Sequence, residues 1–335
     1  MAATIKDIAR LSGLSVATVS KYINGGPVRE KNRVLLERVI QEQDYHINES
    51  ARALKTNRSR TIGLVVSKFG DVFTSELASA IVAELRKYHY SLVVCESHRS
   101  LEGEREAFEF LAAKQVDGIM ATLFSDDGLY YKKLFDRYNI PVVLFDRKLD
   151  MDICDTVILD NVTAAYQATK HLIDAGHREI AVIRGPQGHF TADQRFEGYK
   201  RAMQEAGIPI RNEYILAVDY ADTEMYGYVK ELFTQEKRPT AVFAVIYFTT
   251  ISTIMAMNEL DISIPQDISV FGFDNYYLSS ILKPRLWLME QPLQKIAEEG
   301  THLLMQHINH PEAAEAFRTV AVAANVLEGE SIRKN

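Results

Sequence analysis

Apolar residues recur at helical spacing in the first part of this chain. The pattern begins after Thr4, whose hydroxyl stands three residues before the Asp7 carboxylate, the spacing of a capping box at the start of a helix. Gly13 then interrupts the pattern with a residue that can take positive φ, and Ser15 can cap a second helix that runs to Asn24. The apolar positions of the first helix are Ile5, Ile8, Ala9 and Leu11. The pattern predicts a helix, a tight turn and a second helix.

A third amphipathic stretch follows the glycines and proline at residues 25–27. It extends from about residue 30 to residue 43 and offers Val34, Leu35, Val39 and Ile40 to cover the first two helices. Three short helices of this kind form a small core. Residues 48–60 are polar and basic apart from Leu54, so we expect a linker with helical propensity there.

Beyond residue 60 the pattern changes to short β-branched runs separated by helical stretches. Such alternation predicts parallel sheets with helices on both faces. The runs cover residues 62–66, 91–95, 118–121, 142–145, 180–183, 241–244 and 269–273. Those at 62–66 and 180–183 resemble the first strands of two similar units, so we expect two α/β lobes with a cleft between them. Ligands bind such sheets beyond the carboxyl ends of the strands, so candidate site residues stand directly after a strand.

Composition excludes several classes of protein. The chain has 335 residues, of which 47% are hydrophobic, and this suits two or three compact domains. No apolar run reaches the roughly 18 residues of a membrane span, and residues 1–10 lack the apolar core of a signal peptide, so we expect a cytoplasmic protein. Cys95 and Cys154 are too few for a disulfide framework or a cysteine zinc site, and we expect both to be buried.

The net charge of −7 hides an asymmetry. Residues 1–60 carry 11 Lys and Arg against 6 Asp and Glu, a charge of +5, so the remaining residues carry −12. A short basic unit on an acidic body indicates that the unit contacts a polyanion. A helix-turn-helix places the start of its second helix in the major groove of DNA. Val16 and Ala17 can then contact thymine methyl groups, while Lys21 can reach guanine or a phosphate.

The hydroxyl and amide groups around the second helix suit phosphate contacts. They belong to Ser15, Thr18, Ser20 and Asn24. The alternative is that Thr18 and Ser20 are solvated helix residues and that Val16 packs in the small core. A hinge helix of about nine residues from Asn48 is too short to be stable alone, so we expect it to order on DNA. Its basic residues, Arg52, Lys55 and Arg58, add attraction to phosphates.

The chain closely resembles the lactose-repressor (LacI/GalR) family of bacterial transcription regulators, over essentially its whole length and in the family's order. In the head and hinge the matching residues are 4–9 (TIKDIA), 12–21 (SGLSVATVSK), Asn24 and 48–54 (NESARAL). In the body they are 62–66 (IGLVV), 116–119 (VDGI), 145–147 (FDR), 160–161 (DN), 195–199 (RFEGY), 264–274 (IPQDISVFGFD) and 291–292 (QP).

The resemblance implies a fold and its boundaries. We expect a small all-α helix-turn-helix head over residues 1–47 and a hinge helix with linker over residues 48–60. Residues 61–335 would form an α/β, two-lobed, periplasmic-binding-protein-like effector and dimerisation domain with parallel sheets. Its N-lobe would comprise about residues 61–159 and 291–318, and its C-lobe about residues 160–290 and 319–330.

The family's DNA contacts carry over to matching positions. They are Thr4, Ser15, Val16, Ala17, Thr18, Ser20, Lys21, Asn24, Asn48, Arg52, Leu54 and Lys55. In the family the leucine at the position of Leu54 inserts between base steps of the minor groove, which kinks the duplex. The alternative is that Leu54 packs on its own body.

The family's effector contacts lie after strands or line the cleft. The resemblance places them at Phe73, Asp146, Arg147, Arg195 and Asp274. We add Tyr220, whose aromatic ring can cover a ring face, His189 and Thr191 on the loop after residues 185–186, and Trp287 ahead of residues 291–292. Carboxylates can accept hydrogen bonds from vicinal hydroxyls, a guanidinium donates a fixed fork, and an aromatic ring covers an apolar ring face.

Structural alternatives stay open for several of these residues. Arg195 and Asp274 could form a structural bridge across the cleft. Asp146 and Arg147 could form an ion pair at a strand end. His189 could be a solvated loop residue. Trp287 either lines the cleft or packs beside it. Ile246 and Tyr247 stand where the family commonly has an Asn-Asp pair, which predicts a less polar cavity wall.

The resemblance implies a sequence-specific regulator, most simply a repressor of carbohydrate-utilisation genes. It would bind a palindromic operator as a homodimer, near the nucleoid, under control of a sugar-like effector. Alternatives are control by a phosphorylated carrier protein, a non-sugar effector, a solute-binding protein, or an enzyme on the same lobes. The chain has no phosphate-loop, nucleophile-elbow or zinc-protease motif, so we expect no catalytic residue, metal or cofactor.

Overall fold

The computed structural model describes residues 3–23, 26–45, 52, 58–218, 225–274, 276–312 and 316–335. The chain divides into two units, Met1–Arg60 and Thr61–Asn335, which we call the head and the body. Five of the expected contact residues lie outside the described residues. They are Asn24, Asn48, Leu54, Lys55 and Tyr220.

The head begins with the two capped helices that the sequence predicts. At the start of α1 (Ile5–Ser12) the Asp7 N–H donates to the Thr4 hydroxyl at 3.3 Å, and the Thr4 N–H donates to the Asp7 carboxylate at 3.0 Å. Gly13 ends α1 in the left-handed region, at φ 66°. The Ser15 hydroxyl then accepts the Thr18 N–H at 3.1 Å ahead of α2 (Val16–Ile23). Both predicted caps are confirmed.

The third helix, α3 (Glu30–Glu42), closes the core of the head. Fully buried residues of this core are Ile8, Ala9, Val19, Leu36 and Val39. The expectation that Val34 covers the first two helices is wrong, because its side chain is 55% exposed. The inward stripe of α3 passes through Leu36 and Val39, three positions apart, and Val34 lies off that stripe.

The body contains two six-stranded sheets, one in each lobe. The first has the order β11-β5-β4-β3-β1-β2 and the second the order β12-β10-β9-β8-β6-β7. The first sheet comprises β1 (Thr61–Val66), β2 (Ser91–Glu96), β3 (Gly118–Ala121), β4 (Val142–Phe145), β5 (Asp155–Leu159) and β11 (Thr319–Val322). The second comprises β6 (Ile180–Arg184), β7 (Ile215–Ala217), β8 (Ala241–Ala244), β9 (Ser269–Phe273), β10 (Trp287–Glu290) and β12 (Asn325–Leu327).

Strand pairing is parallel except between β10 and β12. The two sheets repeat one order, so β1 corresponds to β6, β3 to β8 and β4 to β9. This confirms the two similar α/β units and their parallel sheets.

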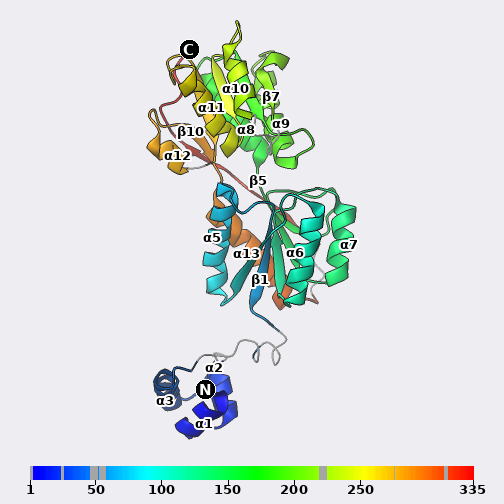
Figure 1. Ribbon diagram of the computed structural model, residues 1–335, viewed down its shortest axis with the longest axis vertical. Helices are drawn as coiled ribbons and strands as arrows, with labels where there is room; N and C mark the ends of the chain where they lie inside the picture. The colour runs from blue at the N-terminus through cyan, green and yellow to red at the C-terminus, as the bar shows by residue number, and fades with distance from the viewer. Residues whose placement is uncertain are drawn as a thin grey trace. The chain divides into compact units, whose positions relative to one another are not determined.

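Helices cover both faces of each sheet (Figure 1). In the first lobe α5 (Val72–Lys87) and α13 (Leu293–Asn309) share one apolar layer, while α6 (Leu101–Ala113) and α7 (Gly128–Tyr138) share the other. In the second lobe α8 (Asn161–Asp174) and α9 (Phe190–Glu205) cover one face, and α10 (Met225–Thr234) and α11 (Tyr247–Glu259) cover the other. Two short helices, η1 (Asn212–Tyr214) and α12 (Tyr276–Ile281), complete the body.

The chain crosses between the lobes after β5, after β10 and after β11. The expected third crossover, before residue 319, is wrong: β11 pairs with β5 of the first lobe, with Thr319 opposite Thr156 and Val322 opposite Leu159. The backbone bond from Thr156 N–H to Arg318 O, at 2.9 Å, extends this pairing by one residue. Among the described helices, none has the length and apolar character that a bilayer crossing requires.

Candidate functional site

A cavity of about 400 Å³ lies between the two lobes, at the carboxyl ends of their strands. Residues after β1, β2, β3 and β4 line it from the first lobe, and residues after β6, β8, β9 and β10 line it from the second. The expected contacts that line it are Phe73, Asp146, Arg147, His189, Thr191, Arg195 and Asp274. The structure therefore brings together seven of the nine residues that the sequence selected.

Asp146 and Asp274 occupy corresponding places in the two lobes, directly after β4 and β9. Both lie in the left-handed region, at φ 68° and 61°, which Asp tolerates better than most residues. The Asp146 N–H donates to Val157 O at 3.1 Å, and the Asp274 N–H donates to Met289 O at 2.7 Å. The backbone thus turns at each strand end while staying bonded to the next strand, and it places both carboxylates at the cavity.

Burial sets the protonation of these carboxyl groups. It raises the pKa of Asp146, against the lowering effect of the positive charges of Arg195 and Arg147. It raises the pKa of Asp274 to about 6, although Arg195 and a hydrogen bond from Gln291 Nε2 at 2.8 Å act in the opposite direction. The cavity therefore holds carboxyl groups that gain from a ligand's hydrogen-bond donors.

Arg195 is 2% exposed and is held in place by the second lobe itself. Its Nε donates to Asn161 Oδ1 at 2.8 Å and its Nη1 to Val245 O at 2.7 Å, while the guanidinium lies 3.7 Å from the centre of the Phe273 ring. No ion pair within 4.0 Å joins Arg195 to Asp274, so its charge acts on that carboxyl at longer range. The alternative of a structural bridge across the cleft is not what this structure shows.

Arg147 reaches from the first lobe to the second. Its Nη2 lies 3.5 Å from His189 Nδ1, a contact across the cleft. The loop that carries His189 is anchored by an ion pair between Arg184 and Asp193 and by the Gly188 N–H, which donates to Asp193 Oδ2 at 2.9 Å. Thr191 follows on the same segment and also lines the cavity.

Phe73 is placed by a local cap. The Asp71 carboxylate accepts the Phe73 N–H at 3.1 Å at the start of α5, and this fixes the first turn of the helix beside the cavity. The Asp71 carboxyl also lines the cavity, and burial raises its pKa.

Trp287 does not line the cavity, so the expectation that it contacts an effector is corrected. Its indole lies in β10, with the ring centre 5.2 Å from His171 and 6.2 Å from Phe271. It packs against the apolar layer under α8 and α9. The side chain faces that layer because residues alternate between the two sides of a strand.

Several lining residues were not selected from the sequence as contacts. Gln291 holds Asp274 and stands directly after β10, the same criterion that selected the aspartates. Asn161, at the start of α8, is not a lining residue but holds Arg195. Ile246, Tyr247 and Phe248 also line the cavity. The sequence predicted this less polar wall at Ile246 and Tyr247.

A larger cavity of about 610 Å³ adjoins the first one along α5. The two share Phe73, Tyr247, Asp274 and Gln291. The larger cavity lacks Arg147, Arg195 and Asp146, and carboxylates such as Glu76 and Glu290 line it. We therefore take the smaller cavity as the candidate effector site and call it the effector cavity.

The start of α2 presents the residues that suit a DNA groove. Val16 is 44% exposed, and Ala17 and Lys21 are also exposed, so Val16 does not pack in the core of the head. Val19 fills that core instead. The hydroxyls of Ser15 and Thr18 lie 2.9 Å apart, and the Thr4 hydroxyl donates to Asp7 at 2.7 Å. Ser20 and Arg52 are partly buried.

Two family models match this chain. One, for bacterial regulatory proteins of the lacI family, covers residues 4–48, and the other, for periplasmic binding proteins and the sugar binding domain of the LacI family, covers residues 59–326. The chain belongs to the LacI family of bacterial regulatory proteins.

Relatives in the LacI family support the assignment over the full length. The HTH-type transcriptional repressor PurR of Pectobacterium atrosepticum is 31% identical over 332 residues, which is 98% of this chain and 97% of that protein. The transcriptional regulator CelR, solved as a complex with cellobiose, is 26% identical, with a TM-score of 0.74 over 98% of this chain and 99% of that one. The chain is therefore a DNA-binding transcriptional repressor of the LacI family and not an enzyme.

The lac repressor dimer, solved with its operator and an anti-inducer, shares the fold. Its TM-score is 0.85 at 21% identity, over 99% of this chain and all of that one. The expected helix-turn-helix head and two-lobed α/β body are confirmed by this likeness and by the family models.

Proposed function

We propose that this LacI-family repressor binds a palindromic operator as a homodimer in the cytoplasm, and that a small sugar-like effector in the effector cavity controls it. One observation supports control by a sugar-like effector. A single cavity holds strand-end aspartates from both lobes, Asp146 and Asp274, beside the buried guanidinium of Arg195.

This set of side chains fits a polyhydroxylated ring. Each carboxylate can accept two hydrogen bonds from neighbouring hydroxyls, and Arg195 can donate to a ring or hydroxyl oxygen. Phe73 and Phe124 supply aromatic faces for the apolar side of a sugar ring. Regulation of carbohydrate-utilisation genes is the simplest role for such a repressor.

Control of DNA binding follows from the position of the cavity between lobes. A ligand that contacts Asp146 and Asp274 together stabilises one relative orientation of the two lobes, because it binds that orientation more tightly. If the hinge binds DNA in only one relative orientation of the two lobes, effector affinity and operator affinity are coupled. The coupling is reciprocal.

The proposed DNA contacts lie in the head, mostly on or beside α2, and in the hinge. Val16 and Ala17 would meet base edges, Lys21 a base or a phosphate, and Leu54 would insert in the minor groove. Thr4 and Ser15 cap the starts of α1 and α2. At these positions the first turns of both helices would contact phosphates. The remaining proposed contacts are Thr18, Ser20, Asn24, Asn48, Arg52 and Lys55.

Exposed apolar side chains on the second lobe support the homodimer. Tyr277 and Ile281 of α12 are 69% and 76% exposed, and Met255 of α11 is 52% exposed. Groups of large exposed apolar side chains are typical of subunit interfaces. A dimer would match the twofold symmetry of a palindromic operator.

A flat heterocyclic effector, such as a purine base, is a second candidate for the same cavity. The observation that favours it is the wall of Ile246, Tyr247 and Phe248, which offers ring faces and few hydrogen-bonding groups. Stacking on such a wall, with ring nitrogens bonded to Asp274 or Arg195, would recognise a base.

A thermal-shift screen tests the effector proposal. Sugars, sugar acids, sugar phosphates and purines are added to wild type, to Asp274→Asn and to a matched control, Asp261→Asn. Asp261 is also left-handed, at φ 53°, and does not line the effector cavity. A true effector raises the unfolding midpoint of wild type and of the control, since it binds only the folded state, and not that of Asp274→Asn. No shift with any compound contradicts the proposal and favours control by a partner such as a phosphorylated carrier protein.

A further inference from the structure

A buried acid lies behind the wall of the effector cavity. Glu104, in the first turn of α6, is 0% exposed and does not line the cavity. Its Oε1 accepts the Phe124 N–H at 2.6 Å, and its Oε2 accepts the Tyr131 hydroxyl at 2.5 Å. Tyr131 belongs to α7 and is also fully buried. Burying a carboxyl group is costly unless it is hydrogen-bonded, so both bonds are needed for this packing.

The two partners of Glu104 define the loop that follows β3. Phe124 lines the cavity, while the next residue, Ser125, donates its N–H to the Tyr131 hydroxyl oxygen at 3.2 Å. The loop begins at Thr122, whose N–H donates to Val65 O at 2.9 Å. Thr122 is thus held by β1, whereas Phe124 and Ser125 are held by the Glu104 and Tyr131 side chains.

Electrostatics links the same acid to the cavity. Burial raises the pKa of Glu104, and the hydrogen bonds from Tyr131 and Phe124 and the positive charge of Arg147 lower it. Arg147 lines the effector cavity and contacts His189 of the other lobe. Glu104 therefore holds the loop at Phe124 and lies within electrostatic range of Arg147.

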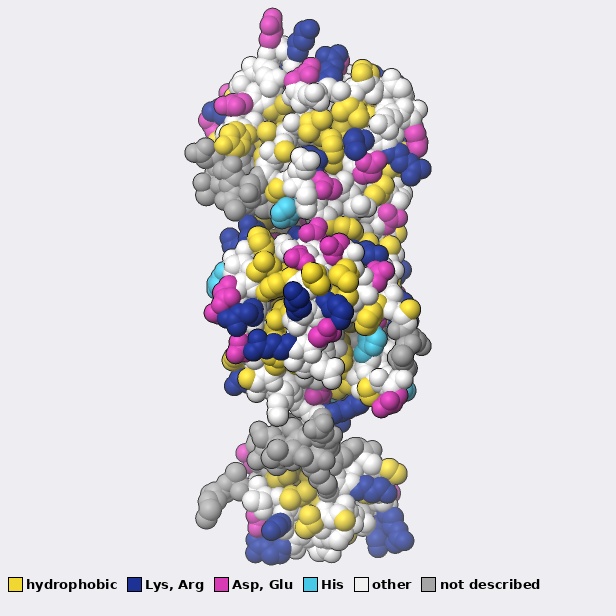
Figure 2. All heavy atoms as spheres, turned by 90° about the vertical axis from the view of Figure 1, so that its right-hand side faces the viewer, with side chains coloured by type: hydrophobic (Ala, Val, Ile, Leu, Met, Phe, Trp, Pro, Cys, Tyr) yellow, Lys and Arg dark blue, Asp and Glu magenta, His cyan; other side chains and the backbone are white. Residues whose placement is uncertain are grey.

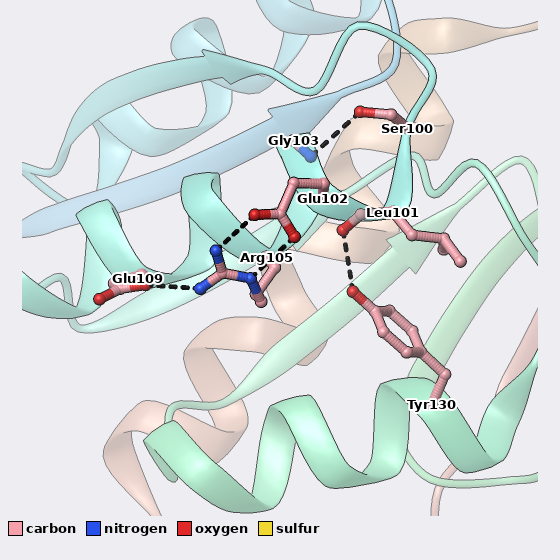
Figure 3. A network of polar contacts seen from close by, with 7 residues as sticks. All are labelled: Ser100, Leu101, Glu102, Gly103, Arg105, Glu109 and Tyr130. Carbon is pink, nitrogen blue, oxygen red and sulfur yellow. Dashed lines mark hydrogen bonds and ion pairs between the residues drawn. The ribbon is translucent and has the colours of Figure 1, made fainter.

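A second tether between α6 and α7 lies close by and does not reach this loop. The Tyr130 hydroxyl donates to Leu101 O at 2.8 Å, beside the exposed ion pairs of Arg105 with Glu102 and Glu109 (Figure 3). This face of the molecule mixes apolar and charged side chains (Figure 2). Phe110 of α6 and Leu129 of α7 are exposed apolar residues. Tyr130 is thus a neighbour of Tyr131 that joins the same two helices, with a hydroxyl that bonds to Leu101 and not to the loop after β3.

We propose that Glu104 and Tyr131 are positioning residues of the effector cavity: together they fix the loop at Phe124 and Ser125, and so set the wall against which the effector packs. This rests on the proposed function of the cavity. Neither residue lines the cavity: Glu104 acts through Phe124, and Tyr131 acts through Ser125 and Glu104.

The test compares two tyrosines that each lose one hydroxyl, Tyr131→Phe and Tyr130→Phe, in the full chain. Glu104→Leu removes both acceptors. Glu104→Gln keeps an oxygen for the Phe124 N–H and can donate its amide to the Tyr131 oxygen, so it serves as the rescue variant. Hydrogen exchange of a peptide covering residues 122–127 reports the loop. Calorimetric titration with cellobiose, D-ribose and adenine reports the cavity.

We expect the hydrogen-exchange rate in residues 122–127 to rise about tenfold or more in Tyr131→Phe and Glu104→Leu. Loss of a buried hydrogen bond of this kind changes the equilibrium for local opening by a factor of about that size. The Kd of whichever probe binds wild type should weaken about tenfold in the same two variants. Tyr130→Phe should leave both quantities unchanged, and Glu104→Gln should stay near wild type.

If Tyr131→Phe and Tyr130→Phe show the same hydrogen-exchange rate in residues 122–127, the proposal is overturned. Faster exchange with an unchanged probe Kd also overturns it, because the loop would then be held for stability alone. If none of the three probes binds wild type, the proposed effector classes are contradicted, and exchange by itself still decides whether Glu104 and Tyr131 fix the loop.

Discussion

The effector cavity depends on a few residues whose backbone conformation is as important as their chemistry. Asp146 and Asp274 turn away from their strands in the left-handed region, at corresponding places in two sheets of the same order. The sequence predicts both, because each carboxylate stands directly after a β-branched or aromatic run. It does not predict the Glu104 and Tyr131 pair, because nothing in a local pattern brings two helices together behind a loop.

The raised pKa of Asp274 leads to a prediction about stability. Its folded-state pKa, about 6, is above the unfolded value of about 3.9, so the stability that this carboxyl contributes is fully present below pH 3.9 and is lost as the pH rises through 6. Asp274→Asn keeps a neutral side chain at every pH. We expect its thermal midpoint in the absence of effector to exceed that of wild type by about 2–4 °C at pH 7.5, and the difference to shrink towards pH 4.5. An equal difference at both pH values contradicts the assigned cause.

At the scale of elements, strands with a local apolar pattern are predicted and strands held by distant partners are not. The predicted runs match β1, β2, β3, β4, β6, β8 and β9 to within one residue. β5 escapes prediction because it begins with Asp155, a residue that usually argues against a strand. Asp155 is nevertheless 1% exposed, because it accepts the Arg318 N–H at 2.6 Å and lies 2.8 Å from His307 Nε2. Those partners are more than 150 positions away in the sequence.

Asp155 therefore offers a test of how the edge of the first sheet is held. Asp155→Ala leaves the His307 ring and the Arg318 N–H without their buried acceptor, which costs about 2–4 kcal/mol. Asp174→Ala is the control, because it removes an exposed i,i+4 pair with Lys170 that is worth less than about 0.5 kcal/mol. Urea unfolding followed by circular dichroism measures both. A loss at Asp155 no larger than that at Asp174 would show that β11 is held by its ladder alone.

At the scale of the whole molecule, three crossovers join two lobes of one design, and the effector cavity lies between them. The sequence predicts the lobes from the repeat of strand patterns. The family resemblance predicts five of the lining residues, and the position of a loop predicts two more, His189 and Thr191. The position of the third crossover, after β11, was not predictable from the sequence. The four residues of β11 suit either sheet equally, and only their pairing with β5 assigns them to the first lobe.

Operator binding tests the proposed coupling between the effector cavity and the DNA-binding head. Affinity for a palindromic operator selected from random DNA is measured by fluorescence anisotropy, with and without a compound that passes the thermal-shift screen. Wild type, Asp274→Asn and Leu54→Ala are compared, the last as a variant that should bind operator weakly under both conditions.

Saturating effector should change the operator Kd of wild type by about tenfold or more, a typical allosteric coupling, and operator should change the effector Kd by the same factor. Asp274→Asn should bind operator as wild type does and show no response. The proposed coupling is contradicted if the operator Kd of wild type stays the same at saturating effector. It is also contradicted if Asp274→Asn is folded but no longer binds operator.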